Sequence, residues 1–147
     1  DTTFRTARAS KLATSADAVP VTLFGALDAP LPDLPAGVAI RRVAMENGGL
    51  SLRGVLAALN ADGITRLLVE GGPHVAGSFI AAGLVDEAVI ARGTGTLAGA
   101  GVLPLADRGL EVFSDPARWL IQSDRHLGSN RITVYRARGH LGARRGE

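Results

Sequence analysis

The sequence contains no cysteine, which excludes disulfides, thiolate chemistry and cysteine-ligated zinc sites. Its three histidines, His74, His126 and His140, are widely spaced and follow no metal-binding pattern, so we expect no metal site. Aromatic residues make up only 4% of the 147 residues, and the formal net charge is +2. A nucleic-acid surface usually needs a dense basic stripe with stacking aromatics. We therefore expect no nucleic-acid partner.

Long hydrophobic runs are also absent. No segment approaches the roughly 18 to 20 apolar residues of a membrane span, and no charged start precedes an apolar signal segment. With 46% hydrophobic and 20% charged residues, the composition is that of an ordinary globular domain that can bury a sizeable core. We expect a cytoplasmic protein with no membrane partner. Because the chain begins at Asp1 without methionine, we expect it to be part of a longer protein.

Apolar patterning predicts alternating strands and helices. Apolar residues at i, i+3, i+4 and i+7 predict a helix over 52–59, with Ser51 as its N-cap and Gly63 as its stop. A second helix is expected over 73–82, and a turn at 47–49. Strands are expected at 20–25, 38–43, 65–69, 86–91, 117–124 and 131–137, the last two as an antiparallel hairpin, with loops at 28–37 and 93–101. The alternation predicts an α/β fold with a mostly parallel sheet flanked by helices.

The junction between the apolar run at 65–69 and the second helix suits an anion. Gly71 and Gly72 let a ligand approach the backbone, and the N–H groups of a helix N-terminus attract phosphate. Pro73 fits the first helical turn. Each feature also has a plainer interpretation: Gly-Gly-Pro is then a tight turn, Glu70 caps backbone or pairs with an arginine, and His74 is a tolerated polar residue. Trp119 and His126 are expected to be packing or turn residues.

The run from Leu68 to Glu87, which reads Leu-Val-Glu-Gly-Gly-Pro-His-Val-Ala-Gly-Ser and continues to Gly-Leu-Val-Asp-Glu, carries a family resemblance. It closely resembles the C-terminal reductase domain of the bifunctional deaminase/reductase of riboflavin biosynthesis. The resemblance extends more loosely from Asp1 to about Arg138. It implies a dihydrofolate-reductase-like fold in which 1–138 form the C-terminal part of a single reductase domain, followed by a flexible basic tail over 139–147.

The resemblance also implies an activity and its residues. The family uses NADPH to reduce the ribosyl group of 5-amino-6-(5-phosphoribosylamino)uracil to a ribityl chain, by hydride transfer to C1′ of the sugar, and it suggests a homodimer. Glu70 falls on the family's substrate-contacting glutamate, and Thr2 on a further cofactor contact. The cofactor-binding loop and helix start fall on Gly71, Gly72, Pro73, His74, Val75, Ala76, Gly77 and Ser78.

Three departures separate the chain from the family pattern. The family's segments that contact the substrate phosphate and the nicotinamide precede the part that begins at Asp1. The zinc-binding deaminase pattern is absent from these residues. Thr94 and Gly95 stand where many relatives have Pro-Lys. Two alternatives therefore stay open: a reductase of the same scaffold acting on another pterin- or pyrimidine-like substrate, and a non-catalytic nucleotide-binding or dimerising module.

Overall fold

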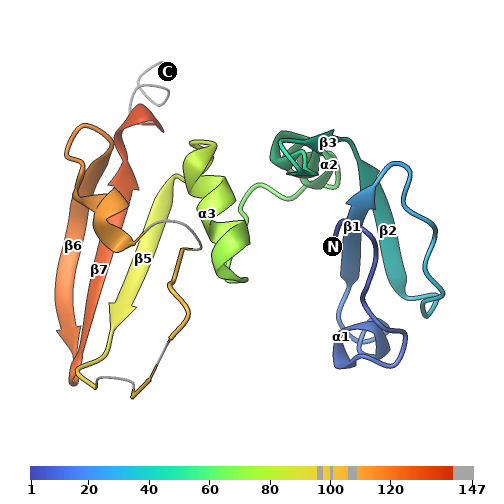
Figure 1. The fold of residues 1–147 in the computed structure, drawn as a ribbon, viewed down its shortest axis with the longest axis horizontal. Helices are drawn as coiled ribbons and strands as arrows, with labels where there is room; N and C mark the ends of the chain where they lie inside the picture. Colours follow the sequence, from blue (N-terminus) through green and yellow to red (C-terminus); the bar gives the residue numbers. More distant parts are fainter. Residues whose placement is uncertain (96–97, 100, 106–108, 141–147) are drawn as a thin grey trace. The chain divides into compact units, whose positions relative to one another are not determined.

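The computed structural model describes residues 1–95, 98–99, 101–105 and 109–140. The chain divides into two units, Asp1–Leu67 and Leu68–Glu147, and each is described by itself (Figure 1). Of the predicted loop at 93–101, residues 96, 97 and 100 lie outside the described residues. Of the predicted tail, residues 139 and 140 belong to a 3₁₀ turn, η2 (Arg138–His140), and 141–147 lie outside.

The first unit is built on two parallel strands, β1 (Val21–Ala26) and β2 (Val38–Val43), which confirm the predictions at 20–25 and 38–43. They follow a short helix, α1 (Lys11–Thr14). Gly25 in β1 is required by a close approach, because a Cβ atom there would lie 2.2 Å from the ring of Phe4. Phe4 and residues of β1, β2 and α1 form the core of this unit.

A two-stranded hairpin and a helix complete the unit. Strands β3 (Met45–Glu46) and β4 (Gly49–Leu50) are joined by Asn47 and Gly48, whose φ angles are 52° and 79°. Two consecutive positive φ angles are typical of a type I′ hairpin turn, and the predicted turn is confirmed. Helix α2 (Leu52–Ala61) follows with Ser51 as its N-cap, as predicted, and Gly63 lies just beyond its end with φ 83°.

The second unit contains helix α3 (Pro73–Ala81) and a three-stranded sheet. The sheet has the order β5-β7-β6, with β5 (Glu87–Arg92), β6 (Trp119–Leu127) and β7 (Asn130–Ala137) all antiparallel to their neighbours. The predicted second helix, the strand at 86–91 and the terminal hairpin are confirmed. A 3₁₀ turn, η1 (Leu110–Ser114), precedes β6.

The core of the second unit is aromatic. Trp119 is 5% exposed and packs edge-on against Phe113, with ring centroids 4.9 Å apart. Tyr135 stacks on Phe113, with ring centroids 5.0 Å apart. Ile80 of α3 and Leu105 pack in the same cluster. The packing role expected for Trp119 is therefore confirmed, and this cluster joins α3 and η1 to one face of the sheet.

The structure differs from the predicted sheet in two features. Residues 64–70 form no regular element, so the predicted strand over 65–69 is wrong, and Leu67 and Leu68 are 45% and 80% exposed. An apolar run becomes a strand only when a neighbouring strand takes up its backbone hydrogen bonds, and that pairing is not visible in local sequence. The α/β class is confirmed, but a mostly parallel sheet is not, because among the described strands only β1 and β2 pair in parallel.

Candidate functional site

The N-terminus of α3 is built by three consecutive residues. Gly72 has φ 53° and ψ 142°, a backbone conformation that a residue with a side chain adopts only under strain. Pro73 occupies the first helical turn, where its missing N–H costs nothing. The first helical hydrogen bond runs from the N–H of Ala76 to the carbonyl of Gly72, at 3.1 Å. The chain therefore turns sharply into α3 at Gly72.

The same turn leaves an open, uncapped helix end. No side chain caps the N-terminus of α3, so the N–H groups of its first turn have no partner from a cap. A Cβ atom added at Gly71 or Gly72 would meet no described atom within 4 Å. Free N–H groups at a helix N-terminus, with the positive end of the helix dipole and room for a ligand, are suited to a phosphate. The residues therefore fit a dinucleotide phosphate.

The side chains around this turn differ in how far a ligand can reach them. His74 is exposed, and Val75 is 48% exposed. Ala76 and Gly77 are half-buried, and Ala76 packs against the core of the second unit. The hydroxyl of Ser78 donates a hydrogen bond to the carbonyl of His74, at 2.8 Å, and so is already used within the helix. The backbone of Gly71 and Gly72, with the first turn of α3, is thus the accessible part.

Glu70 lies directly before this turn. Sequence reasoning placed it at the end of a buried strand, at the edge of the core, and that placement is wrong because residues 64–70 form no strand and Glu70 is exposed. Within the part of the chain that the structure describes, Glu70 makes no hydrogen bond or ion pair. The arginine pairing and backbone capping of the plainer interpretation are not found among the described residues.

Thr2 belongs to the other unit. Its carbonyl accepts a hydrogen bond from the N–H of Ala26, at 3.0 Å, and this bond holds Thr2 beside the last residue of β1. Ligands of open α/β sheets bind at the carboxyl ends of strands, and Thr2 is placed at such an end. Glu70 and residues 71–78 lie next to one another in the second unit. Thr2 lies in the first unit and is described only there.

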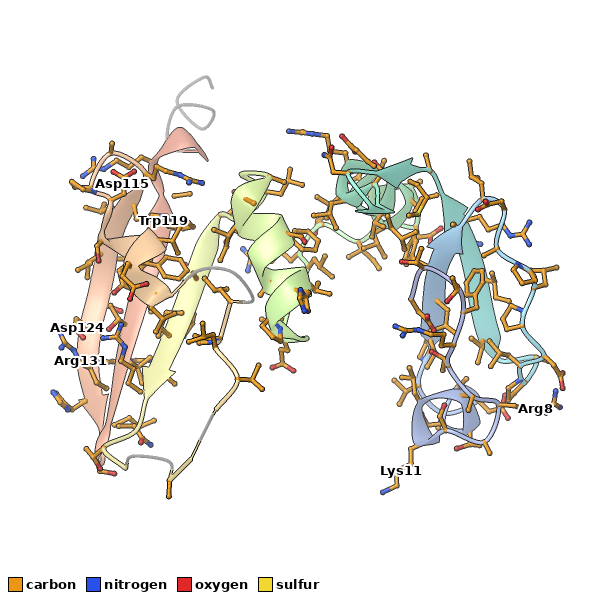
Figure 2. All side chains as sticks on the ribbon, in the orientation of Figure 1. Arg8, Lys11, Asp115, Trp119, Asp124 and Arg131 are labelled. Atoms are coloured by element: carbon orange, nitrogen blue, oxygen red, sulfur yellow. The ribbon has the colours of Figure 1, made fainter. Side chains whose placement is uncertain are left out.

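Sequence reasoning missed a polar cluster on the terminal hairpin. Asp124 of β6 accepts hydrogen bonds from Arg131 Nε, at 2.9 Å, and from Thr133 Oγ1, at 3.1 Å, and also pairs with Arg131 Nη2 (Figure 2). The Arg131 hydrogen bonds lower the pKa of Asp124 from 3.8 to about 2, and they raise the pKa of Arg131. Opposite charges on one face of a hairpin were the available signal. Because the carboxylate oxygens of Asp124 accept hydrogen bonds from Arg131 and Thr133 of β7, this cluster links the two strands of the hairpin.

Two classes of feature are not found in the described part of the chain. No group of three or more potential metal-ligating side chains comes together there. None of its helices has both the length and the apolar character needed to cross a bilayer.

Comparison with known proteins identifies the family. Residues 6–122 match the family model described as the RibD C-terminal domain. The chain belongs to this family. The resemblance inferred from the Leu68–Glu87 run is thereby confirmed, and the chain is a member of the reductase-domain family of riboflavin biosynthesis. The Gly71–Ser78 turn lies inside the matched range.

A solved structure supports the same RibD fold. The structure of RibD from Acinetobacter baumannii (form 2) is similar to this chain with a TM-score of 0.70 and 18% sequence identity, over 93% of this chain. The chain covers 36% of that protein. At this identity the likeness establishes the fold. The comparison with curated proteins yields no match.

Proposed function

We propose that this chain forms the C-terminal part of an NADPH-dependent reductase domain that reduces 5-amino-6-(5-phosphoribosylamino)uracil to its ribitylamino product in riboflavin biosynthesis. The observation that carries the proposal is the uncapped N-terminus of α3, entered through Gly72 at positive φ, in a member of the RibD C-terminal domain family. In this proposal residues 1–138 belong to one reductase domain.

The chain's own residues would bind and orient the reactants. The N–H groups of the first turn of α3 would hold a cofactor phosphate, and Gly71 and Gly72 would let it approach the backbone. NADPH, when bound, supplies the hydride, while the protein supplies position and electrostatics. Glu70 lies directly before this turn, and its exposed carboxylate would accept hydrogen bonds from the substrate. Thr2 would contribute a further cofactor contact.

The test is substitution of Gly72 in the full-length protein. Gly72→Val adds a branched side chain at the open approach to the helix end and at a φ of 53° that disfavours it. We expect NADPH affinity to fall strongly while substrate affinity changes little, as measured by calorimetric titration of each. Circular dichroism reports whether the variant is folded.

Gly128→Val is the matched control for backbone strain. Gly128 lies in the turn between β6 and β7 with φ 60°, and a Cβ atom there also meets nothing within 4 Å. This variant also places a branched side chain at a positive φ, away from α3, and should bind NADPH as the parent does. If a folded Gly72→Val protein also binds NADPH as tightly as the parent, the Gly-Gly-Pro junction is only a turn, and the cofactor assignment is withdrawn.

A further inference from the structure

Phe4 adopts a backbone conformation that is rare for a residue with a side chain. Its φ angle is 53°, and among the described residues Asn47 is the only other non-glycine residue with a positive φ. Asn47 lies in a hairpin turn that requires such an angle, whereas Phe4 lies outside any hairpin. A bulky side chain is strained in this region, because its Cβ atom lies too close to a carbonyl oxygen. Strain of this kind persists only where the surrounding structure fixes it, and it is frequent at binding sites.

Gly25 of β1 provides the space in which Phe4 is fixed. Phe4 is 6% exposed, and a Cβ atom at Gly25 would lie 2.2 Å from its ring. Carbon atoms in contact lie about 3.5 to 4.0 Å apart, so the ring occupies space that only a glycine leaves free. Gly25 has no positive φ, and its own backbone therefore does not require glycine. The glycine in this strand is explained by the ring that packs on it.

Hydrogen bonds close residues 1–6 into a turn, which we call the Asp1–Thr6 turn. The N–H of Phe4 donates to the carbonyl of Asp1, at 3.1 Å. The carboxylate of Asp1 accepts hydrogen bonds from the N–H and the hydroxyl of Thr6, at 2.8 and 2.9 Å. The N–H of Ala26, the last residue of β1, donates to the carbonyl of Thr2, at 3.0 Å. This bond and the ring of Phe4 hold the turn against the end of β1.

The turn leaves two hydroxyl groups free. Among the described residues, neither Thr2 Oγ1 nor Thr3 Oγ1 makes a hydrogen bond, and Thr3 is exposed. Thr2 lies at the carboxyl end of β1, which pairs in parallel with β2. Ligands of α/β sheets bind at the carboxyl ends of parallel strands. The strain at Phe4, the glycine beneath its ring and the free hydroxyls at this end of the strand together indicate a turn that is held in place for binding.

We propose that Phe4, packed on Gly25, is a positioning residue that holds the Asp1–Thr6 turn in the conformation in which Thr2 contacts the cofactor. This inference rests on the proposed function, in which Thr2 contributes a contact to NADPH. Phe4 is buried and touches no ligand itself, so its effect on cofactor affinity passes through Thr2.

The test is Gly25→Ala in the full-length reductase. The added methyl group enters the space of the Phe4 ring and forces the ring away from β1, while the backbone of the strand accepts alanine. We expect the dissociation constant of NADPH to rise about two- to ten-fold, the factor for losing one neutral hydrogen bond, with substrate affinity unchanged. Phe4→Leu, which removes the ring and keeps an apolar side chain, should have the same effect. Calorimetric titration measures both affinities.

A second measurement needs no cofactor. Because the N–H of Ala26 donates to the carbonyl of Thr2, this amide should be protected from hydrogen exchange in the parent protein. Gly25→Ala and Phe4→Leu should each make its exchange faster. Thr2→Ala keeps the backbone carbonyl and should leave the exchange unchanged.

Combining variants shows whether Phe4 acts through Thr2. Thr2→Ala removes the hydroxyl and should weaken NADPH binding by the same factor of about two to ten. Adding Gly25→Ala to Thr2→Ala should weaken binding no further, because both substitutions remove one and the same contact.

Two controls in the same unit separate positioning from general effects. Gly49→Ala adds a methyl group in β4, at a position without a positive φ and with no described atom within 4 Å of the new Cβ. Val21→Ala weakens the same core at the amino end of β1, where Val21 is buried. Both proteins should bind NADPH as the parent does, although Val21→Ala should lower the melting temperature.

Several results would overturn the proposal. If folded Gly25→Ala and Phe4→Leu proteins bind NADPH as tightly as the parent while Gly72→Val weakens binding, the proposed function stands and Phe4 is only a core residue. Additive losses in Gly25→Ala and Thr2→Ala mean that Phe4 does not act through Thr2. An equal loss in Val21→Ala means that affinity follows stability. Unchanged binding in Gly72→Val removes the cofactor assignment itself, and this inference with it. Circular dichroism confirms that each variant is folded.

Discussion

Glu70 is the residue whose interpretation changes most between sequence and structure. Its carboxylate is exposed, and the described residues offer it neither a hydrogen bond nor an ion pair, so its removal leaves no buried partner unsatisfied. Surface substitutions of this kind usually alter stability by less than about 0.5 kcal/mol. Substitution of Glu70 therefore tests its proposed substrate contact with little expected cost to the fold.

The first prediction follows for Glu70→Gln in the full-length reductase. If Glu70 binds substrate, turnover should fall about ten- to a hundred-fold, because a charged hydrogen bond contributes roughly 1.5 to 3 kcal/mol. The melting temperature should stay close to the parent's. Steady-state kinetics and thermal unfolding measure the two quantities. A lowered melting temperature with an unchanged rate per folded molecule would make Glu70 structural.

Asp124 makes a second prediction at the residue scale. Its pKa is lowered from 3.8 to about 2 in the folded protein by hydrogen bonds from Arg131. A group with a lowered pKa in the folded state stabilises the fold above its unfolded pKa and loses that effect as the pH falls toward the folded one. Asp124→Asn should therefore unfold more easily than the parent at pH 7, and this difference should shrink between about pH 4 and pH 2.

Urea unfolding at several pH values measures that difference. Asp33→Asn is the control, because Asp33 pairs with Arg8 in an exposed ion pair whose side chains are 85% and 58% exposed. Such pairs contribute little to stability. A difference between Asp124→Asn and the parent that is as large at pH 2 as at pH 7 would contradict the assigned role of the carboxylate.

At the scale of elements, α2 depends on Ser51, the N-cap that precedes its first residue. The hydroxyl of Ser51 accepts a hydrogen bond from the N–H of Gly54, at 3.2 Å, and donates one to Glu46 Oε2, at 3.0 Å. This one side chain caps α2 and ties it to β3 of the hairpin. None of the residues of α2 is buried, so packing contributes less to this helix and the cap contributes relatively more.

The expected result for Ser51→Ala is a loss of about 0.5 to 2 kcal/mol, the usual cost of removing an N-cap. For a chain of this size, each 1 kcal/mol corresponds to roughly 2–4 °C in melting temperature. Ser51→Thr keeps the hydroxyl and should recover most of the loss. Calorimetry measures the melting temperatures of the parent, Ser51→Ala and Ser51→Thr. Equal melting temperatures would show that the cap does not contribute to stability.

At the scale of the whole molecule, the sheet of the second unit has one face without a described partner. The strand register places Val89, Leu120 and Leu127 on the face opposite the core, with exposures of 60%, 40% and 70%. The two outer strands, β5 and β6, each have an edge that pairs with no described strand. Exposed apolar faces and free edges favour association.

We therefore expect a homodimer, with a mass by light scattering of twice that of one chain at micromolar concentration. Val89→Lys should shift the population toward monomer, since it places a charge on this face. Leu12→Lys, at a residue 50% exposed in the other unit, is the matched control and should leave the mass unchanged. A single monomer mass for the parent protein would contradict the expectation.

Local sequence was sufficient where the physical cause is itself local. Ser51 caps α2, Asn47 and Gly48 form their turn, and the 73–82 segment forms α3, because capping, positive φ and helical periodicity act over a few neighbouring residues. The Gly-Gly-Pro entry into α3 was visible for the same reason. The family could also be recognised from the sequence, because the residues that identify it are consecutive in the Leu68–Glu87 run.

Other features were decided by tertiary structure, because they depend on partners distant in the chain. Whether residues 65–69 form a strand, and whether β5 pairs in parallel, depends on which backbone lies alongside, and the apolar pattern is the same either way. The ion pair of Asp124 with Arg131 follows from a register across the hairpin.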